Sequence, residues 1–426
     1  MSSVLRKVRR SKKRLNREVE LVNREQYEAM ELDAKVGLIQ DLTSIGMMHV
    51  SETLQQEVAE LAGTRYARQE GGSRAYRHGS NPGTVRLGGQ KLAVRVPRVR
   101  NEEGEIPLES YRALHENSGA VDERLLRRVL YGISCRNYEK AAEDIPGAIG
   151  LSSSTVSRSF IESSATQLKA FQERDLSGED YVALFLDGKS FSDTMMVVAL
   201  GVTIDGKKHP IGFVETTTEN KTTLVEFLRG LLARGLDVSE GILAVIDGAK
   251  GLRAAVREAF SRRVVVGRCN WHKRENVVSY LPRGEQASWR KRLQRALDRP
   301  TYGEAKKEIA KLHSELEEIN QSAAASLKEG QEEILTLHRL GVFGKLGSSF
   351  KTTNCLESIN GLIEERCSKV DCWKNSNQKQ RWMAAALMDI EPRLRRVRGC
   401  RHLPLLREAL KRELKIENAT AKVTAA

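Results

Sequence analysis

Two carboxylates in the middle of the chain each follow an apolar run. The run Tyr181-Val-Ala-Leu-Phe-Leu ends at Asp187, and Ile242-Leu-Ala-Val-Ile ends at Asp247. Runs that are apolar on both faces are typical of central strands covered on both sides. Adjacent carboxylates repel unless a cation lies between them, and Mg²⁺ prefers such oxygen ligands. Because two such ions can activate an attacking oxygen and stabilise a leaving oxygen, the pair predicts metal-dependent chemistry at a phosphodiester.

The alternative is that these residues are only turn residues, since Asp-Gly is a common turn dipeptide. Three Asp-Gly pairs occur, beginning at Asp187, Asp205 and Asp247. Asp205 precedes two lysines between two candidate strands, so we interpret it as part of a solvent-exposed hairpin turn. The other two end buried runs, where an unpaired carboxylate is costly. The pattern therefore favours Asp187 and Asp247 as the functional pair.

The surrounding sequence predicts the elements that bring this pair together. Hydrophobic spacing predicts three strands, a helix, a strand, a helix and a strand. The ranges are Tyr181–Asp187, Thr194–Ile204, His209–Thr216, Thr222–Arg234, Ile242–Asp247, Leu252–Phe260 and Val264–Gly267. This is the order of a ribonuclease H-like fold, in which a hairpin-built mixed sheet carries helices on its faces. Asp187 and Asp247 are then expected on adjacent strands.

The charge of the chain favours a polyanionic partner. Its 426 residues include 70 Lys and Arg but only 56 Asp and Glu, a formal net charge of +14. Such a surplus favours nucleic acid, although a merely basic soluble protein or one that touches anionic lipid fits it too. The length predicts two to four globular domains. No apolar run approaches the ~20 residues of a membrane span. The charged N-terminus lacks the apolar core of a signal peptide, so we expect a cytoplasmic protein without membrane partners.

The six cysteines, at positions 135, 269, 355, 367, 372 and 400, show no paired framework. This scatter predicts reduced thiols. Cys367 and Cys372 lie close together, but no second pair with zinc-finger spacing accompanies them, so a structural zinc site is only a minor alternative.

Two basic regions open the chain. The first seventeen residues contain eight Lys and Arg and no acid, which predicts a phosphate-contacting arm or a solvated tail. The rest of residues 1–70 shows apolar positions at helical spacing. Residues 71–120 predict a small Gly-rich basic β-element with Leu92, Val94 and Val96 on one face. Pro97 predicts that this strand is an edge strand or ends there.

Residues 121–175 predict three helices, the second from about Cys135 to Glu143. The last begins at a serine cap and carries small polar residues in its first turns, which resembles a helix-turn-helix. In that motif Ser154, Thr155 and Arg158 would face base edges in the major groove. A plain three-helix bundle has the same pattern, so both interpretations stay open.

Short motifs between residues 76 and 398 recur in a characteristic order. They are Arg77-His-Gly, Val96-Pro-Arg-Val-Arg, Glu105-Ile-Pro-Leu-Glu-Ser-Tyr, Leu186-Asp-Gly, Ile246-Asp-Gly-Ala-Lys-Gly-Leu, Arg268-Cys-Asn-Trp-His, Thr352-Thr-Asn-Cys-Leu-Glu-Ser-Ile-Asn and Gln380-Arg-Trp-Met. Each is weak alone, but together they resemble the bacterial insertion-sequence transposases of the Mutator-like type. The resemblance implies a DDE-type trio of Asp187, Asp247 and Glu357.

Glu357 rests mainly on this resemblance, because the C-terminal half holds many glutamates. Its surroundings predict a helix capped by Thr352 or Thr353, with Glu357 beside an apolar stripe. Its alternative is a solvated helix glutamate. The family also carries a pair matching Cys269 and His272, which implies a role near the active site. Two ligands do not make a zinc site, so the sequence favours a structural or DNA-positioning role.

The resemblance implies an enzyme that cleaves the terminal inverted repeats of its element and transfers strands by 3′-hydroxyl attack. It would use Mg²⁺ or Mn²⁺, as two ions, and act on repeat and target double-stranded DNA as at least a dimer. We expect multidomain α/β architecture: a ribonuclease H-like core in residues 180–274 and 348–415, a helical insertion at 275–347 and a tail at 416–426. The alternatives are a non-catalytic DNA-binding protein or a ribonuclease H-like nuclease. The predicted DNA contacts are Arg95, Arg98, Arg100, Ser154, Thr155, Arg158, Arg268 and Arg366.

Overall fold

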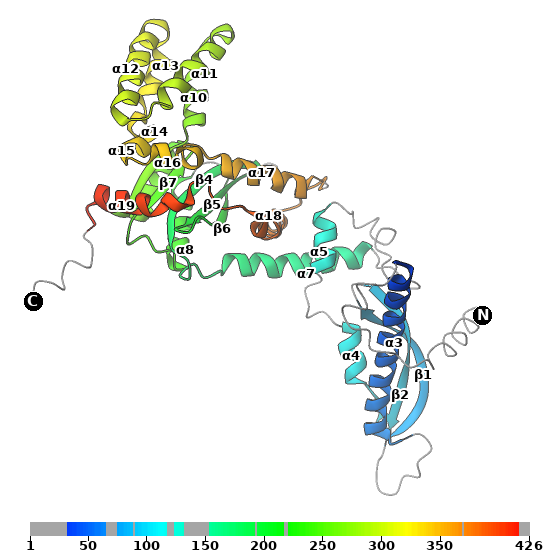
Figure 1. The fold of residues 1–426 in the computed structure, drawn as a ribbon. Coiled ribbons are helices and arrows are strands. Elements are labelled where there is room, and N and C mark those ends of the chain that lie inside the picture. The colour runs from blue at the N-terminus through cyan, green and yellow to red at the C-terminus, as the bar shows by residue number, and fades with distance from the viewer. Residues whose placement is uncertain are drawn as a thin grey trace, which may run out of the picture. The chain divides into compact units, whose positions relative to one another are not determined.

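The computed structural model describes residues 32–64, 75–87, 90–116, 123–131, 153–191, 194–216, 220–368 and 370–416, and Figure 1 shows their elements. They form a mixed α/β protein with two sheets. The chain divides into two compact units, Met1–Ala120 with Ala142–Leu151, and Val121–Ala141 with Ser152–Ala426. In the described parts, no helix is both long and apolar enough to cross a membrane. The basic arm, the predicted helix at 135–143 and most of the tail lie outside the described residues.

The N-terminal unit packs helices on an antiparallel sheet. Its elements are α3 (Leu32–Ala62), β1 (Tyr76–Leu87), β2 (Gln90–Asn101), β3 (Gly104–Ile106) and α4 (Glu109–Glu116), with strand order β1-β2-β3. Val50, Leu54 and Val58 of α3 share a core with Leu92 and Val99 of β2. The predicted alternation places Leu92, Val94 and Val96 at this core, as expected. Local amphipathic patterns thus suffice to build this unit.

Pro97 does not lie on an edge strand, because β2 is the middle strand of the three. That part of the prediction is wrong for an identifiable reason. β3 pairs only with Val99–Asn101, so at Pro97 the strand has a neighbour on one side alone. On that side β1 carries an extra residue between Arg77 and Ser80. A residue without an N–H is therefore accommodated where the second ladder is missing and the first is irregular.

The larger unit contains the sheet predicted from the sequence. Its elements are β4 (Tyr181–Phe191), β5 (Thr194–Thr203), β6 (Lys208–Thr216), α8 (Lys221–Ala233), β7 (Ile242–Ile246), α9 (Lys250–Phe260), η1 (Ser261–Arg263) and β8 (Val264–Arg268). The predicted order of strands and helices is confirmed. In space the strands run β6-β5-β4-β7-β8. β4, β5 and β6 pair antiparallel, whereas β7 and β8 join β4 in parallel, which makes the sheet mixed.

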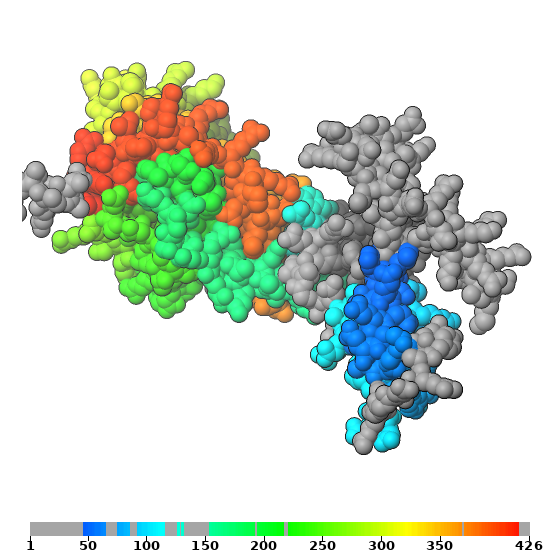
Figure 2. Space-filling view, turned by 60° about the horizontal axis from the view of Figure 1, so that its bottom comes forward, coloured from blue at the N-terminus to red at the C-terminus, as the bar shows by residue number. Residues whose placement is uncertain are grey.

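Helices cover both faces of this sheet. On one face α8 and α9 share a core with alternate residues of β4 and β7, including Leu184, Leu186 and Ile246. On the other face Phe185 stacks on Phe350 of α16 (Phe343–Phe350). That face also contacts α17 (Asn354–Cys367) and α19 (Leu403–Leu414). Figure 2 shows the red C-terminal segment lying against the green sheet-bearing part of the chain. The central strands are therefore covered on both sides, as their continuous apolar runs predict.

Between β8 and α16 the chain forms a helical insertion with its own core. It comprises α10 (Asn270–Val278), α11 (Arg283–Leu297), α12 (Tyr302–Ile319), α13 (Gln321–Lys328), α14 (Gln331–Ile334) and α15 (Thr336–Arg339). Trp289, Leu293, Ile309 and Leu316 are among its buried residues. In Figure 1 the helices α11 to α13 project away from the sheet. The insertion thus has a core separate from that of the sheet.

Helices that precede the mixed sheet in the sequence pack on a helix that follows it. α5 (Glu123–Leu130) and α7 (Ser153–Gln172) contact α18 (Ser376–Ile390), and all three helices belong to the same unit as the mixed sheet. Phe160 of α7 lies 4.7 Å, ring to ring, from Trp382 of α18. Trp382 also meets Trp373 edge-on. These aromatic side chains therefore pack against one another within this unit.

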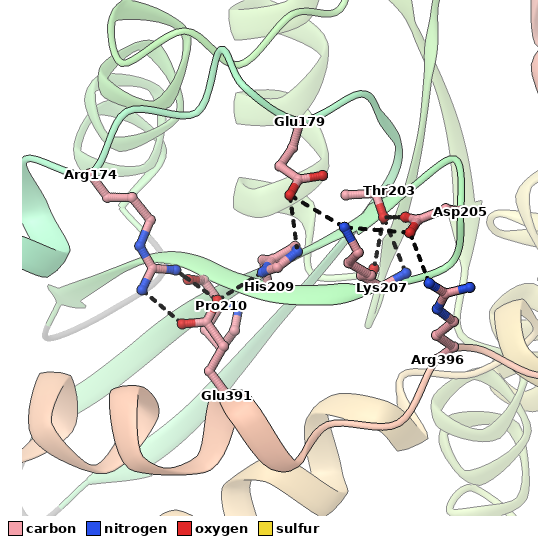
Figure 3. A network of polar contacts seen from close by, with 9 residues as sticks. All are labelled: Arg174, Glu179, Thr203, Asp205, Lys207, His209, Pro210, Glu391 and Arg396. Atoms are coloured by element: carbon pink, nitrogen blue, oxygen red, sulfur yellow. Dashed lines mark hydrogen bonds and ion pairs between the residues drawn. The ribbon is translucent and has the colours of Figure 1, made fainter.

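The turn between β5 and β6 is held by a polar network (Figure 3). The Thr203 hydroxyl donates to Asp205, and Gly206 has a φ of 87°, which favours glycine. Arg396 pairs with Asp205 at 3.3 Å, while His209 lies 2.8 Å from Glu391 of η2 (Glu391–Arg393). The segment after α18 is thereby tied to this turn, and η3 (Cys400–His402) leads on to α19. The interpretation of Asp205 as a turn residue is confirmed.

Candidate active site

Strand pairing brings Asp187 and Asp247 to the same level of the sheet. In the parallel pairing of β4 with β7, Leu186 lies opposite Ile246, so each aspartate is the next residue along its strand. Leu186 and Ile246 both point into the core under α8 and α9. Because side chains alternate along a strand, Asp187 is directed to the opposite face, where α17 packs against β4, and Asp247 directly follows the neighbouring strand. The two strands are adjacent, as predicted, with Asp187 inside β4 and Asp247 one residue beyond the end of β7.

Asp187 is a buried carboxyl held in an acidic environment. Only 6% of its surface is exposed. Burial raises its pKa to about 6, and the negative charges of Asp247 and Glu357 add to the rise. The positive charge of His272 and a hydrogen bond from Thr353 act in the opposite direction. All three predicted carboxylates therefore interact electrostatically, and the metal-free protein holds more negative charge here than its own cations neutralise.

Asp247 opens the loop between β7 and α9. Its Oδ1 accepts a hydrogen bond from the N–H of Ala249 at 2.9 Å, and Gly248 has a φ of 105°. A Cβ on Gly248 would overlap Nε of Arg268, so the loop passes close to this guanidinium. Asp247 thus has turn chemistry, as the alternative interpretation of Asp-Gly requires, and also lies level with Asp187. The two interpretations are compatible at this residue.

Glu357 lies in the first turn of α17 and is exposed. Its N–H donates to the carbonyl of Thr353 at 3.1 Å. Thr353 occupies the N-cap position, as predicted, but its side chain does not cap the helix. The hydroxyl is directed instead to Cys269 Sγ, 3.6 Å away, and lies 3.5 Å from His272 Nδ1. The capping prediction is therefore wrong, because other polar atoms compete for this hydroxyl.

Cys269 and His272 begin the insertion, directly beside the carboxylates. Cys269 is fully buried. Although burial alone would raise the pKa of its thiol, hydrogen bonds from His272 and Thr353 outweigh that effect and lower it. The hydrogen bond with Cys269 raises the pKa of His272 to about 9, with further contributions from Asp187 and Asp247. His272 is therefore a cation at neutral pH, facing the acidic group.

The residues present suit a hard divalent cation. Among the described residues, no three His, Cys, Asp or Glu side chains are already gathered closely enough to ligate a metal. The chemistry of the donors nevertheless fits, because all three are carboxylates. Burial raises the pKa of Asp187, the charges of Asp247 and Glu357 raise it further, and a bound cation would oppose this rise by favouring the ionised carboxylate.

The predicted DNA contacts fall into two groups. Arg95, Ser154 and Arg158 are exposed, and Thr155 is half-buried. Arg98 makes a two-pronged ion pair with Glu105, at 2.6 and 2.7 Å, and Arg100 lies 3.5 Å from His78. None of these geometries tests DNA contact, which stays a prediction.

Arg268 and Arg366 are placed differently, since both are buried. Arg268 pairs with Glu329 at 3.2 Å. Arg366 pairs with Asp389 at 3.1 Å and lies over the ring of Tyr131. Their positions support a structural role and do not support direct contact with DNA.

Sequence reasoning missed two residues of this region. Thr353 was predicted only as a cap, and nothing in its local sequence points to the thiol of a residue 84 positions away. Trp271 is 44% exposed and meets His272 edge-on. An exposed tryptophan is unusual, but exposure cannot be derived from a motif.

Comparisons with known proteins agree on one family. Residues 15–396 match the model described as Transposase, Mutator family. The chain is 28% identical, over 323 residues, to the transposase for insertion sequence element IS256 in transposon Tn4001 of Staphylococcus aureus, covering 72% of this chain and 78% of that protein. It is 27% identical, over 364 residues, to the transposase for insertion sequence element IS406 of Burkholderia multivorans, covering 80% of this chain and 88% of that protein.

Proposed function

The chain belongs to the Mutator family of transposases, and on this premise we propose that Asp187, Asp247 and Glu357 form a DDE-type active site for DNA cleavage and strand transfer. The observation that carries the proposal is the parallel pairing of β4 with β7, which brings Asp187 and Asp247 to the same level, close enough for Asp247 to raise the pKa of Asp187. The influence of Glu357 on the pKa of Asp187 supports its membership of the same site. The mixed sheet, with its hairpin followed by two parallel strands, supports a ribonuclease H-like core.

In this proposal the protein positions DNA and metal ligands and forms no covalent bond to DNA. Asp187, in β4, and Asp247, directly after β7, would hold the metal, and Glu357 would complete the set from α17. Two ions of Mg²⁺ or Mn²⁺, when bound, supply the charge that activates the attacking oxygen and stabilises the leaving oxygen. The attacking oxygen belongs first to water, at the end of the element, and then to the freed 3′-hydroxyl of the DNA. His272 contributes a fixed positive charge beside the carboxylates.

The partner is double-stranded DNA carrying terminal inverted repeats, followed by target DNA. The net charge of +14 supports a phosphate-rich partner. We propose contacts through Arg95, Arg98, Arg100 and the first turns of α7, where Ser154, Thr155 and Arg158 lie. Because two ends must be joined, we propose at least a dimer on DNA, acting in the cytoplasm. The segments 1–70, 71–120 and 121–175 would provide DNA binding, with catalysis in 180–274 and 348–415.

Asp247→Asn tests the proposal, with Asp205→Asn as the matched control in another Asp-Gly turn. The assay measures Mg²⁺-dependent cleavage and strand transfer on DNA that carries the repeats flanking the gene, and repeat binding by gel shift. We expect Asp247→Asn to bind repeats and lose cleavage, while Asp205→Asn keeps both. Undiminished cleavage by Asp247→Asn contradicts the assignment. Cleavage by the wild type without strand transfer favours the ribonuclease H-like nuclease, and binding without cleavage favours the non-catalytic protein.

A further inference from the structure

The start of the helical insertion is bonded to the segment that leads into α17. The insertion begins with α10, directly after Cys269, and after α15 the chain passes through α16, which packs on the sheet, to Lys351. The N–H of Asn270 donates to the carbonyl of Lys351 at 2.8 Å, which joins the beginning of the insertion to the chain just before α17. Glu357 follows in the first turn of α17. The position of the third carboxylate therefore depends on how this junction is held.

Cys269 joins the two sides of the junction. Its N–H donates to the carbonyl of Ile246 at 2.7 Å, the residue directly before Asp247. Its sulfur accepts from the N–H of Thr353 at 3.4 Å and from the Thr353 hydroxyl at 3.6 Å. Both side chains have no measurable exposure. One buried residue thus bonds to the strand of the second carboxylate and to the helix start of the third.

Thr353 extends this connection to Glu357. Its carbonyl accepts the N–H of Glu357 at 3.1 Å. The hydroxyl also lies 3.5 Å from Nδ1 of His272. A residue whose only role was to start α17 would turn its hydroxyl to the helix, and Thr353 does not.

We propose that Cys269 and Thr353 form a latch that positions Glu357 against Asp187 and Asp247 across the helical insertion. The inference rests on the proposed active site and assigns the two residues as positioning residues, not catalytic ones. The physical reason is loop closure: the entropy lost in bringing chain ends together grows with the length between them. The latch and the backbone bond of Asn270 together counter that loss at the base of the insertion. Contact with the insertion, by DNA or by a second protomer, can thereby reach the third metal ligand.

The test compares four variants of the full-length protein. Thr353→Val keeps the shape and removes the hydroxyl, Thr353→Ser keeps the hydroxyl, and Cys269→Ala removes the acceptor. Cys367→Ala is the matched control, because Cys367 is also buried but lies at the far end of α17. The readouts are repeat binding, thermal unfolding, and the cleavage rate at saturating DNA as a function of Mg²⁺ concentration.

We expect Thr353→Val and Cys269→Ala to need about 10-fold or more Mg²⁺ for half-maximal cleavage, with repeat binding unchanged, since groups that orient metal ligands have effects of about 10–100-fold. Thr353→Ser should restore the wild-type Mg²⁺ dependence, and Cys367→Ala should keep it. A purely structural role would lower the unfolding temperature without moving the Mg²⁺ dependence, and this result overturns the latch. If Cys269→Ala fails to fold, the comparison of Thr353→Val with Thr353→Ser tests the latch.

Asp247→Asn is assayed in the same series to separate the two hypotheses. If Asp247→Asn is inactive while both latch variants keep the wild-type Mg²⁺ dependence, the active site stands and the latch fails. If Asp247→Asn still cleaves DNA, the proposed active site itself fails, and the latch fails with it.

Discussion

Replacing Asp187 with asparagine should stabilise the metal-free protein while it abolishes cleavage. In the wild type, burial and the neighbouring Asp247 raise the pKa of Asp187 from 3.8 to about 6. Since each pKa unit corresponds to about 1.4 kcal/mol, this rise lowers the unfolding free energy by about 3 kcal/mol when the carboxyl is ionised. The folded state binds the proton more tightly than the unfolded state, so the ionised carboxylate destabilises the fold. Asparagine has a similar shape and carries no charge to desolvate.

The sign of the pH dependence follows from the same shift. Below about pH 3 Asp187 is protonated in both states, because its pKa is 3.8 in the unfolded state and about 6 in the folded state, and the substitution gains nothing. As the pH rises from 3.8 to about 6, the wild type loses stability, and above that range the full difference of about 3 kcal/mol remains. The gain of Asp187→Asn should therefore be roughly half as large at pH 5 as at pH 8. Saturating Mg²⁺ should reduce the gain, because a bound cation stabilises only the wild-type carboxylate.

Denaturant unfolding at pH 5 and pH 8, with EDTA or with Mg²⁺, measures this difference. Asp205→Asn is the matched control, because its hydrogen bond from Thr203 lowers the pKa of Asp205. Removing that charge should not increase stability at either pH. The reasoning is refuted if Asp187→Asn shows the same gain at both pH values, or if Asp205→Asn shows a gain of equal size.

Two further predictions concern residues around the site. Gly248→Ala should lower stability and cleavage, because the φ of 105° disfavours alanine and the added Cβ would meet Arg268. Gly230→Ala is the control, because its added Cβ would have no atom within 4 Å. It should be neutral or stabilising in the same assays. Arg366→Ala should lower the unfolding free energy by about 3 kcal/mol, because it leaves the buried Asp389 without its main partner. Repeat binding should stay intact. A loss of binding at unchanged stability would instead restore the predicted role of Arg366 as a DNA contact.

The central sheet could be predicted because its signal is local. Continuous apolar runs that end in aspartate specify buried strands and place a carboxylate at a known end of each. The order of strands and helices then leaves few ways to pair them, and right-handed crossovers bring β7 beside β4. The same reasoning could not judge Arg268 or Arg366. Whether an arginine faces DNA or a buried carboxylate depends on partners such as Glu329, 61 residues away, that no local pattern reveals.

The position of Glu357, unlike the positions of the two aspartates, depends on contacts between residues far apart in the sequence. Positions 187 and 247 are brought together by the backbone hydrogen bonds of one sheet, so their proximity follows once the sheet forms. Glu357 is separated from them by the whole insertion, and its helix is positioned by apolar packing and by the bonds between Cys269 and Thr353. None of these contacts of α17 is a strand ladder that local sequence patterns predict. If the proposed active site and latch hold, the sheet fixes two of the ligands, and the position of the third responds to what the insertion binds.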